Sequence, residues 1–179
     1  LVGSEMCIRD SSKRAPHEGG IRTPIMFKLP EVIEPEMNTS TLVSNIDLVP
    51  TVLDFLNITG EELSGISVME KEKLNTRETL FIECYHHDIL NVERPTETVL
   101  YKVALNKKWK LMLPNTKMVV REFTLPEEQY YGYYSNKPQL YDLENDPEEK
   151  VNLAKQHPDI VVKMRNQINN WWQPIKHMN

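Results

Sequence analysis

The sequence predicts an α/β chain that ends in a small antiparallel sheet with a C-terminal helix across it. Apolar residues recur at helical spacing over 47–58, and a second helical stripe runs over 158–172. Between them, segments 79–85, 98–105 and 108–113 are rich in β-forming residues. Helical periodicity followed by short strands and a closing helix indicates this mixed class.

The first elements are a strand and a helix. The apolar run Ile25–Phe27 predicts a buried strand. Asp47–Ile58 predicts a helix of about three turns, because Asp47 is a suitable N-cap and Pro50 is tolerated in a first turn. Gly60 lies just past the predicted end, where glycine commonly terminates helices.

Three strands are predicted next. Thr79–Tyr85 alternates in the manner of a strand with two different faces. Thr98–Leu105 and Lys108–Leu113 flank Asn106 and Lys107, which predicts a tight antiparallel hairpin. We expect the lysines of this hairpin at exposed positions, where they would protect the sheet edge from pairing.

The C-terminal third predicts a short strand and the final helix. Gln139–Leu143 reads as a strand, and the Asn145, Asp146, Pro147 sequence is a turn signal that ends it. The final helix is predicted over Pro158–Trp172, and its apolar stripe packs on the sheet through Ile160, Val161, Met164, Ile168 and Trp171.

Composition excludes several classes of partner. The chain has 179 residues with 26 acidic and 21 basic side chains, and its pI is about 5.6. Neutralising phosphates needs a basic face, so we expect no nucleic-acid partner. No run approaches the roughly 20 apolar residues of a membrane span, so no membrane partner is expected. We interpret residues 1–11 as a non-native, adapter-like segment and leave them out of fold reasoning.

Three motifs carry functional information. Lys13 precedes the sequence His-Glu-Gly-Gly-Ile-Arg-Thr-Pro, which begins at His17. Leu42–Ile58 contains Asp-Leu-Val-Pro-Thr, and Gln139–Ala154 contains Leu-Tyr-Asp-Leu-Glu-Asn-Asp-Pro-Glu-Glu-Lys-Val-Asn-Leu. In this order and spacing they resemble signatures of the sulfatase family, and the resemblance extends from Lys13 to the end of the chain. In that family a Tyr stands where this chain has His17.

The resemblance implies a fold and an activity. It implies the C-terminal part of an alkaline-phosphatase-like sulfatase domain, in which residues 12–75 end the catalytic α/β domain and residues 76–179 form a C-terminal subdomain. The parent protein would hydrolyse sulfate esters or sulfamates by a formylglycine and calcium mechanism. Its partner would be a sulfated small molecule or carbohydrate.

The chain also departs from the family pattern. No Cys/Ser-x-Pro-x-Arg sequence follows either cysteine, and the family's calcium-ligating Asp and Asn residues precede its lysine. We therefore expect no metal ligands in this chain and no turnover by the chain alone. Two other classes remain open: a non-catalytic binding or structural module, and a fragment of a related phosphoryl-transfer enzyme of the same superfold.

The first motif supplies two candidate site residues. By resemblance, Lys13 is the sulfate contact, and a compact ammonium charge suits a sulfuryl oxygen. The alternative is an ordinary solvated lysine. His17 is either a second polar contact to substrate or a packing substitute for Tyr. Glu18 and Arg22 are more consistent with a structural pair than with catalysts.

A second candidate site follows the strand at 79–85. The Glu83–Asp88 segment is dense in histidine and carboxylate, which suggests zinc, but neighbouring residues of a strand point to opposite faces. By resemblance to sulfatases with a Trp-Lys-Leu hairpin, here at 109–111, we predict that His87 and Asp88 contact substrate. Asp88 as a cap of the strand or loop is the alternative.

A third candidate is a group of aromatic residues near the C-terminus. Aromatic rings suit sugar faces, but they more often pack a helix on a sheet, and we favour packing. The group consists of Tyr130, Tyr131, Tyr133, Tyr134, Trp171 and Trp172.

Overall fold

The computed structural model describes residues 16–60, 62–85, 94–116 and 135–173. The chain divides into two compact units. One comprises the chain up to Pro24 together with Phe81–Asn179, and the other is Ile25–Leu80. None of the helices described is long and apolar enough to cross a membrane.

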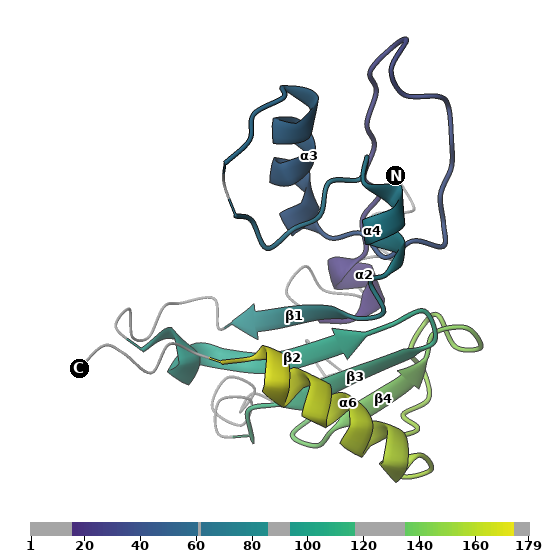
Figure 1. The fold of residues 1–179 in the computed structure, drawn as a ribbon. Coiled ribbons are helices and arrows are strands. Elements are labelled where there is room, and N and C mark those ends of the chain that lie inside the picture. The colour runs from purple at the N-terminus through teal and green to yellow at the C-terminus, as the bar shows by residue number, and fades with distance from the viewer. Residues whose placement is uncertain (1–15, 61, 86–93, 117–134, 174–179) are drawn as a thin grey trace, which may run out of the picture. The chain divides into compact units, whose positions relative to one another are not determined.

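The first unit is built on a four-stranded sheet with strand order β1-β2-β3-β4 (Figure 1). The strands are β1 (Leu80–Tyr85), β2 (Val99–Leu105), β3 (Trp109–Pro114) and β4 (Gln139–Asp142). The 3-10 helix η2 (Pro95–Thr98) leads into β2. Both β2 with β3 and β3 with β4 pair antiparallel. The strands predicted at 79–85, 98–105, 108–113 and 139–143 and the small antiparallel sheet are therefore confirmed.

The β2–β3 hairpin is closed by Asn106. Its backbone N–H donates to the Trp109 carbonyl oxygen at 2.9 Å, and its side-chain Oδ1 accepts from the N–H groups of Lys108 at 2.9 Å and Trp109 at 2.7 Å. Asparagine thus supplies the local hydrogen bonds that a tight turn needs. The resulting register pairs Leu105 with Lys110.

Helix α6 (Pro158–Trp171) covers one face of this sheet, packing on β2 and β3 (Figure 1). Val161, Met164 and Ile168 are buried at spacings of three and four residues, as the helical stripe predicts. They pack with Ala104, Leu111, Leu113 and Leu140 of the sheet. A second core cluster, with Leu100, Tyr101, Val103, Met112 and Tyr141, includes residues that alternate with these along the strands.

The second unit contains the 3-10 helix η1 (Asn45–Asp47), helix α3 (Leu48–Phe55) and helix α4 (Lys71–Asn75). The predicted helix is confirmed. Asp47 stands at its N-cap position but makes no side-chain cap hydrogen bond to it; its carboxylate instead accepts from the Ser44 N–H in the capping box of η1. Its end differs from the prediction. Asn57 takes a left-handed conformation (φ 54°), and its N–H and that of Ile58 donate to the Asp54 and Leu53 carbonyls in a Schellman arrangement. Asn57 rather than Gly60 therefore ends the helix.

A buried carboxylate organises this unit. Asp47 is fully buried, and its two carboxylate oxygens accept from both Arg77 guanidinium nitrogens at 2.6 and 2.7 Å. The same oxygens accept from the backbone N–H groups of Ser44 at 2.7 Å and Ile66 at 2.8 Å. Burial alone raises the pKa of Asp47, but these hydrogen bonds and the Arg77 charge outweigh it and hold the pKa below its usual value.

The loop at 65–68 packs closely against the start of α3 and is hydrogen-bonded to it. Thr51 Oγ1 donates to the Asp47 carbonyl oxygen at 2.6 Å and accepts from the Val68 N–H at 3.0 Å. A Cβ at Gly65 would lie 2.1 Å from the Ile46 carbonyl oxygen, so only glycine fits there. The Asp-Leu-Val-Pro-Thr motif therefore binds its helix to this loop.

The predicted strand at Ile25–Phe27 is wrong. These residues form no strand, and Met26 is 90 % exposed. A strand exists only where a neighbour takes up its backbone hydrogen bonds, and none of the four described strands pairs with this segment.

The Asp47–Arg77 pair yields a stability prediction. Arg77→Met leaves a buried carboxylate without its cation, so we expect the second unit to lose about 3 to 5 kcal/mol. Hydrogen exchange of peptides within residues 45–77 measures this loss directly.

The matched control is Lys71→Met, which breaks an ion pair with Glu36 of 2.7 Å between side chains that are 69 % and 51 % exposed. Exposed pairs contribute little, so we expect a change below about 1 kcal/mol. Equal effects of the two substitutions would contradict the anchoring role of Asp47.

Candidate functional site

Most predicted site residues lie outside the described residues. This holds for Lys13, His87 and Asp88, and for the tyrosines at positions 130, 131, 133 and 134. Their roles remain predictions. His17 is described, and it lies with its neighbour Glu18 at the start of the short helix α2 (Glu18–Ile21). The candidate site is therefore built from the turn that carries His17.

His17 is buried and paired with a distant carboxylate. It is 4 % exposed, and its Nδ1 lies 3.1 Å from Glu149 Oε2. The backbone N–H of Glu18 donates to the same oxygen at 2.7 Å. The His17 ring also meets the Tyr141 ring edge to face, with 6.0 Å between centroids. The turn is thus attached to the sheet unit through one carboxylate.

Lys110 joins the same cluster, which corrects the expectation that the hairpin lysines are exposed. Its side chain is 0 % exposed, and its Nζ lies 2.8 Å from Glu149 Oε1 and 3.1 Å from Glu18 Oε1. Lys110 shares a sheet face with Met112, so the strand directs it inward. Two carboxylates offset the cost of burying its charge.

The predicted pairing of Glu18 with Arg22 is present but loose. Arg22 Nη1 lies 3.7 Å from Glu18 Oε2, and the Arg22 side chain is 72 % exposed. Most of the attachment of the Glu18 side chain therefore comes from Lys110, whose contact with Glu18 Oε1 is shorter and involves a fully buried ammonium and a side chain that is only 15% exposed.

Glu149 comes from the last motif, and the motif's other polar residues shape its turn. Asp146 accepts from the N–H groups of Lys150 at 3.0 Å and Val151 at 2.8 Å. Asn152 Oδ1 accepts from the Leu140 N–H on β4 at 3.1 Å. These bonds close the chain around Glu149 and bring it back to the sheet. The motif is therefore a scaffold that aims one carboxylate.

The cluster keeps Glu149 ionised. Burial alone raises the pKa of its carboxyl, but the His17 hydrogen bond and the Lys110 charge outweigh burial and hold the pKa below its usual value. An ionised carboxylate only accepts hydrogen bonds, so the proton at this contact resides on His17 Nδ1. The Lys110 ammonium forms ion pairs with the carboxylates of Glu18 and Glu149, so its role is structural.

Cys84 of β1 is a poor nucleophile. It is half-buried, and burial raises the pKa of its thiol to about 11. A thiol with that pKa is protonated near neutral pH, whereas the reactive form is the thiolate. Within the described ranges, 16–60, 62–85, 94–116 and 135–173, no group of three His, Cys, Asp or Glu side chains could hold a metal ion.

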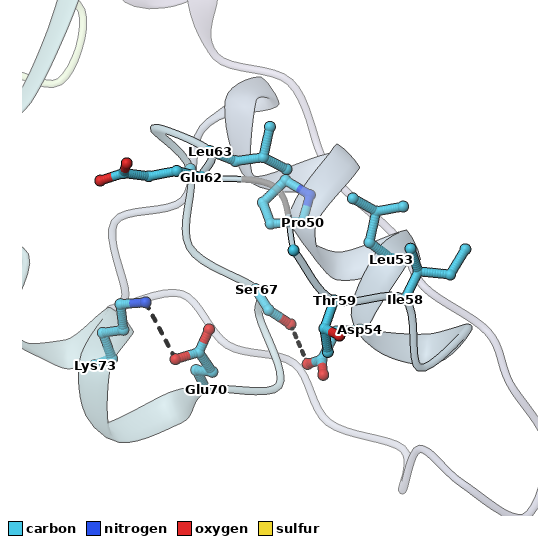
Figure 2. Close-up of a pocket in the computed structure, with 12 residues that line it drawn as sticks. Pro50, Leu53, Asp54, Ile58, Thr59, Glu62, Leu63, Ser67, Glu70 and Lys73 are labelled. Carbon is cyan, nitrogen blue, oxygen red and sulfur yellow. Dashed lines mark hydrogen bonds and ion pairs between the residues drawn. The ribbon is translucent and has the colours of Figure 1, made fainter.

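A hollow of about 350 Å³ lies beside α3 in the second unit (Figure 2). Figure 2 shows that polar groups lining it pair with one another: Ser67 donates to Asp54 at 2.7 Å, and Lys73 lies 3.3 Å from Glu70. His17, the predicted site residue that the structure describes, is not among the residues that line this hollow.

The C-terminal tryptophans take part in packing. Trp171 stacks on Phe81 of β1, with 4.9 Å between centroids and 10° between ring planes. The Lys102 ammonium lies 4.0 Å from the centre of the Trp172 ring. For these two residues of the aromatic group, the structure favours packing of α6 on the sheet.

Comparison with known proteins identifies the family. Residues 10–173 match the family described as N-sulphoglucosamine sulphohydrolase, C-terminal. The chain belongs to this sulfatase family. The resemblance carried by the three motifs is thereby confirmed.

Curated relatives of this sulfatase chain are considerably longer. It is 28% identical over 173 residues to a sulfatase of Formosa agariphila, covering 87% of this chain and 28% of that protein. It is 29% identical over 159 residues to an N-acetylgalactosamine-6-O-sulfatase of Bacteroides thetaiotaomicron, covering 89% and 29%. Among solved structures, a 2-O GAG sulfatase matches 70% of this chain and 23% of its own, with 20% identity and a TM-score of 0.47.

Sequence reasoning missed Lys110 and Glu149. A signal existed for each. Lys110 alternates with the buried Met112 along a strand, which directs both to one face, and Glu149 stands at a defined position of the last motif. Glu149 pairs with His17 and Glu18, which lie 132 and 131 positions away in the sequence, and no local pattern reveals such a pairing.

The lowered pKa of Glu149 predicts a pH-dependent stability. Its contribution is complete above the ordinary Glu pKa of about 4.3 and is lost as pH falls through the lower folded value. We therefore expect Glu149→Gln to be clearly less stable than the original chain at about pH 7, with a smaller deficit at about pH 3.

Urea unfolding followed by tryptophan fluorescence measures this difference, since all three tryptophans belong to the first unit. Glu144→Gln is the control, because that side chain is 56% exposed and lies 3.8 Å from Lys108. A Glu149→Gln deficit that stays constant between the two pH values would contradict the prediction.

Proposed function

We propose that this chain works as the C-terminal part of a sulfatase that hydrolyses sulfate esters or sulfamates. The observation that carries this proposal is the family match over residues 10–173, together with the three motifs in order. A sulfated carbohydrate is the substrate class we favour, because the Bacteroides relative is named an N-acetylgalactosamine-6-O-sulfatase and a Formosa relative an ulvan-active sulfatase.

The chain's own contribution to the chemistry is a positive charge. We assign Lys13 to the sulfuryl oxygens, where an ammonium stabilises negative charge on the group being transferred. In this proposal the nucleophile is a formylglycine and the metal is calcium, both held outside the described residues. The described residues offer no set of metal ligands, so none of them is assigned to calcium.

Three further residues are proposed on the substrate side. His17, His87 and Asp88 would contact the substrate around the sulfate. Of these, His17 has its Nδ1 already engaged by Glu149, so any contact with substrate falls to the rest of its ring. If Ala variants of His87 and Asp88 left KM for two sulfated sugars unchanged, both residues would be removed from the site.

The apolar surface of α3 supports a role within a larger domain. Val49, Val52 and Leu56 are 57%, 50% and 61% exposed. Apolar side chains at helical spacing normally face a core, and a contiguous exposed set marks an interface. A helix of this kind fits a chain that packs against further protein.

An activity comparison tests the proposal. We expect the complete open reading frame to hydrolyse a chromogenic aryl sulfate or a sulfated sugar, and the isolated 179-residue chain to show no turnover, even with added calcium. Hydrolysis by the purified chain alone would contradict the proposal that the nucleophile and the metal lie outside it. A complete protein that hydrolyses phosphate diesters and no sulfate ester would place it in a phosphoryl-transfer class instead.

The Lys13 assignment predicts a large catalytic effect. Losing one charge contact to a transferring group in a water-poor site lowers kcat by roughly 100- to 1,000-fold, so we expect Lys13→Ala to reduce kcat/KM on that scale. Lys13→Arg should recover only part of it, because a planar fork does not replace a point charge. A folded Lys13→Ala enzyme within about twofold of the parent would show that Lys13 is not the sulfate contact.

A further inference from the structure

We propose that Lys110 and Glu149 are positioning residues that clamp the turn carrying His17 to the C-terminal sheet, and so hold the His17 ring in one place and orientation. This inference rests on the proposed function, because it takes His17 as a residue on the substrate side. Every member of the clamp is a described residue, and His17 and Glu18 both contact Glu149 directly.

The first argument is the cost of the arrangement. Lys110 is 0 % exposed, and its charge is offset only because Glu18 and Glu149 both meet it. Apolar residues surround it on β3, so a simple core would have placed an apolar residue there. The cluster instead joins Glu18 to Lys110 across 92 positions and to Glu149 across 131 positions.

The second argument is the backbone at Glu149. Its φ is 56°, in the left-handed region that residues other than glycine and asparagine rarely adopt. Such a conformation persists where the surroundings over-determine it, and it concentrates at functional positions. Here the conformation places a 3 % exposed carboxylate between the His17 ring and the Lys110 ammonium.

The third argument is the division of labour between the carboxylate oxygens. Oε2 accepts from His17 Nδ1 and from the Glu18 N–H, and Oε1 faces Lys110. Among the described residues, Oε2 is therefore held by two hydrogen bonds and Oε1 by its ion pair with Lys110 alone, and together they set the orientation of the His17 ring. Fixed groups behind a contact residue are what hold a reactive geometry within the small tolerance that catalysis needs.

The test uses the complete open reading frame with three variants: Lys110→Met, Glu149→Gln and the double variant. We expect each single variant to lose kcat by roughly 10- to 100-fold, with KM changed by less than about threefold, because misplacement of His17 affects the transition state most. Lys110→Met leaves two carboxylates without their ammonium and the double variant leaves only that of Glu18, so the double variant should melt above Lys110→Met while its kcat stays low.

Two controls separate positioning from general damage. Lys108→Met removes a lysine two residues from Lys110 whose side chain is 45% exposed, and it should leave kcat unchanged. The second control adds Glu149→Gly and compares it with Glu31→Gly, since both positions have positive φ but Glu31 is exposed. We expect Glu31→Gly to relieve backbone strain without changing kcat, and Glu149→Gly to lower kcat.

Hydrogen exchange supplies a readout that does not depend on activity. Well below the melting temperature, both single variants should exchange faster in peptides covering 16–22 and unchanged in peptides covering 99–114. Unchanged exchange at 16–22 would overturn the clamp, and so would a double variant whose kcat recovers together with its melting temperature. A complete protein without sulfatase activity refutes the proposed function, while the exchange data still decide the clamp.

Discussion

The sheet unit depends on one buried lysine. An ammonium without water costs several kcal/mol, and Lys110 is tolerated because two carboxylates from distant parts of the chain reach it. Those two carboxylates can reach it only if the turn at 17–18 and the loop at 146–149 are both in place. The charge therefore couples three segments that local sequence preferences would leave independent, and it makes their arrangement specific as well as stable.

The second unit also buries a charged group, and there the charge is negative. Asp47 is a buried carboxylate that accepts from a guanidinium and from two backbone N–H groups, and Glu149 accepts from a backbone N–H beside a lysine. In both cases the acid belongs to a family motif. Each of these two motifs thus places an acid where a backbone N–H and a cation converge.

Periodicity predicted the elements well and the long-range pairings poorly. The α6 stripe, the hairpin around Asn106 and the short β4 strand each follow from contacts within a few residues, so the sequence alone was sufficient. The Ile25–Phe27 strand failed because a strand needs a neighbour, which no local pattern provides. The end of α3 was misplaced for a different reason: Asn57 satisfies the left-handed position that glycine usually occupies.

The candidate site shows the same division. Resemblance named His17, but whether it was buried depended on Glu149, more than a hundred positions away. Lys110 was expected on the surface because a strand lysine usually protects an edge, yet the residues beside it already indicated an inward direction. A charged residue that alternates with core residues is therefore better interpreted as one half of a buried pair, and the partner is best sought among the acids of the chain's other motifs.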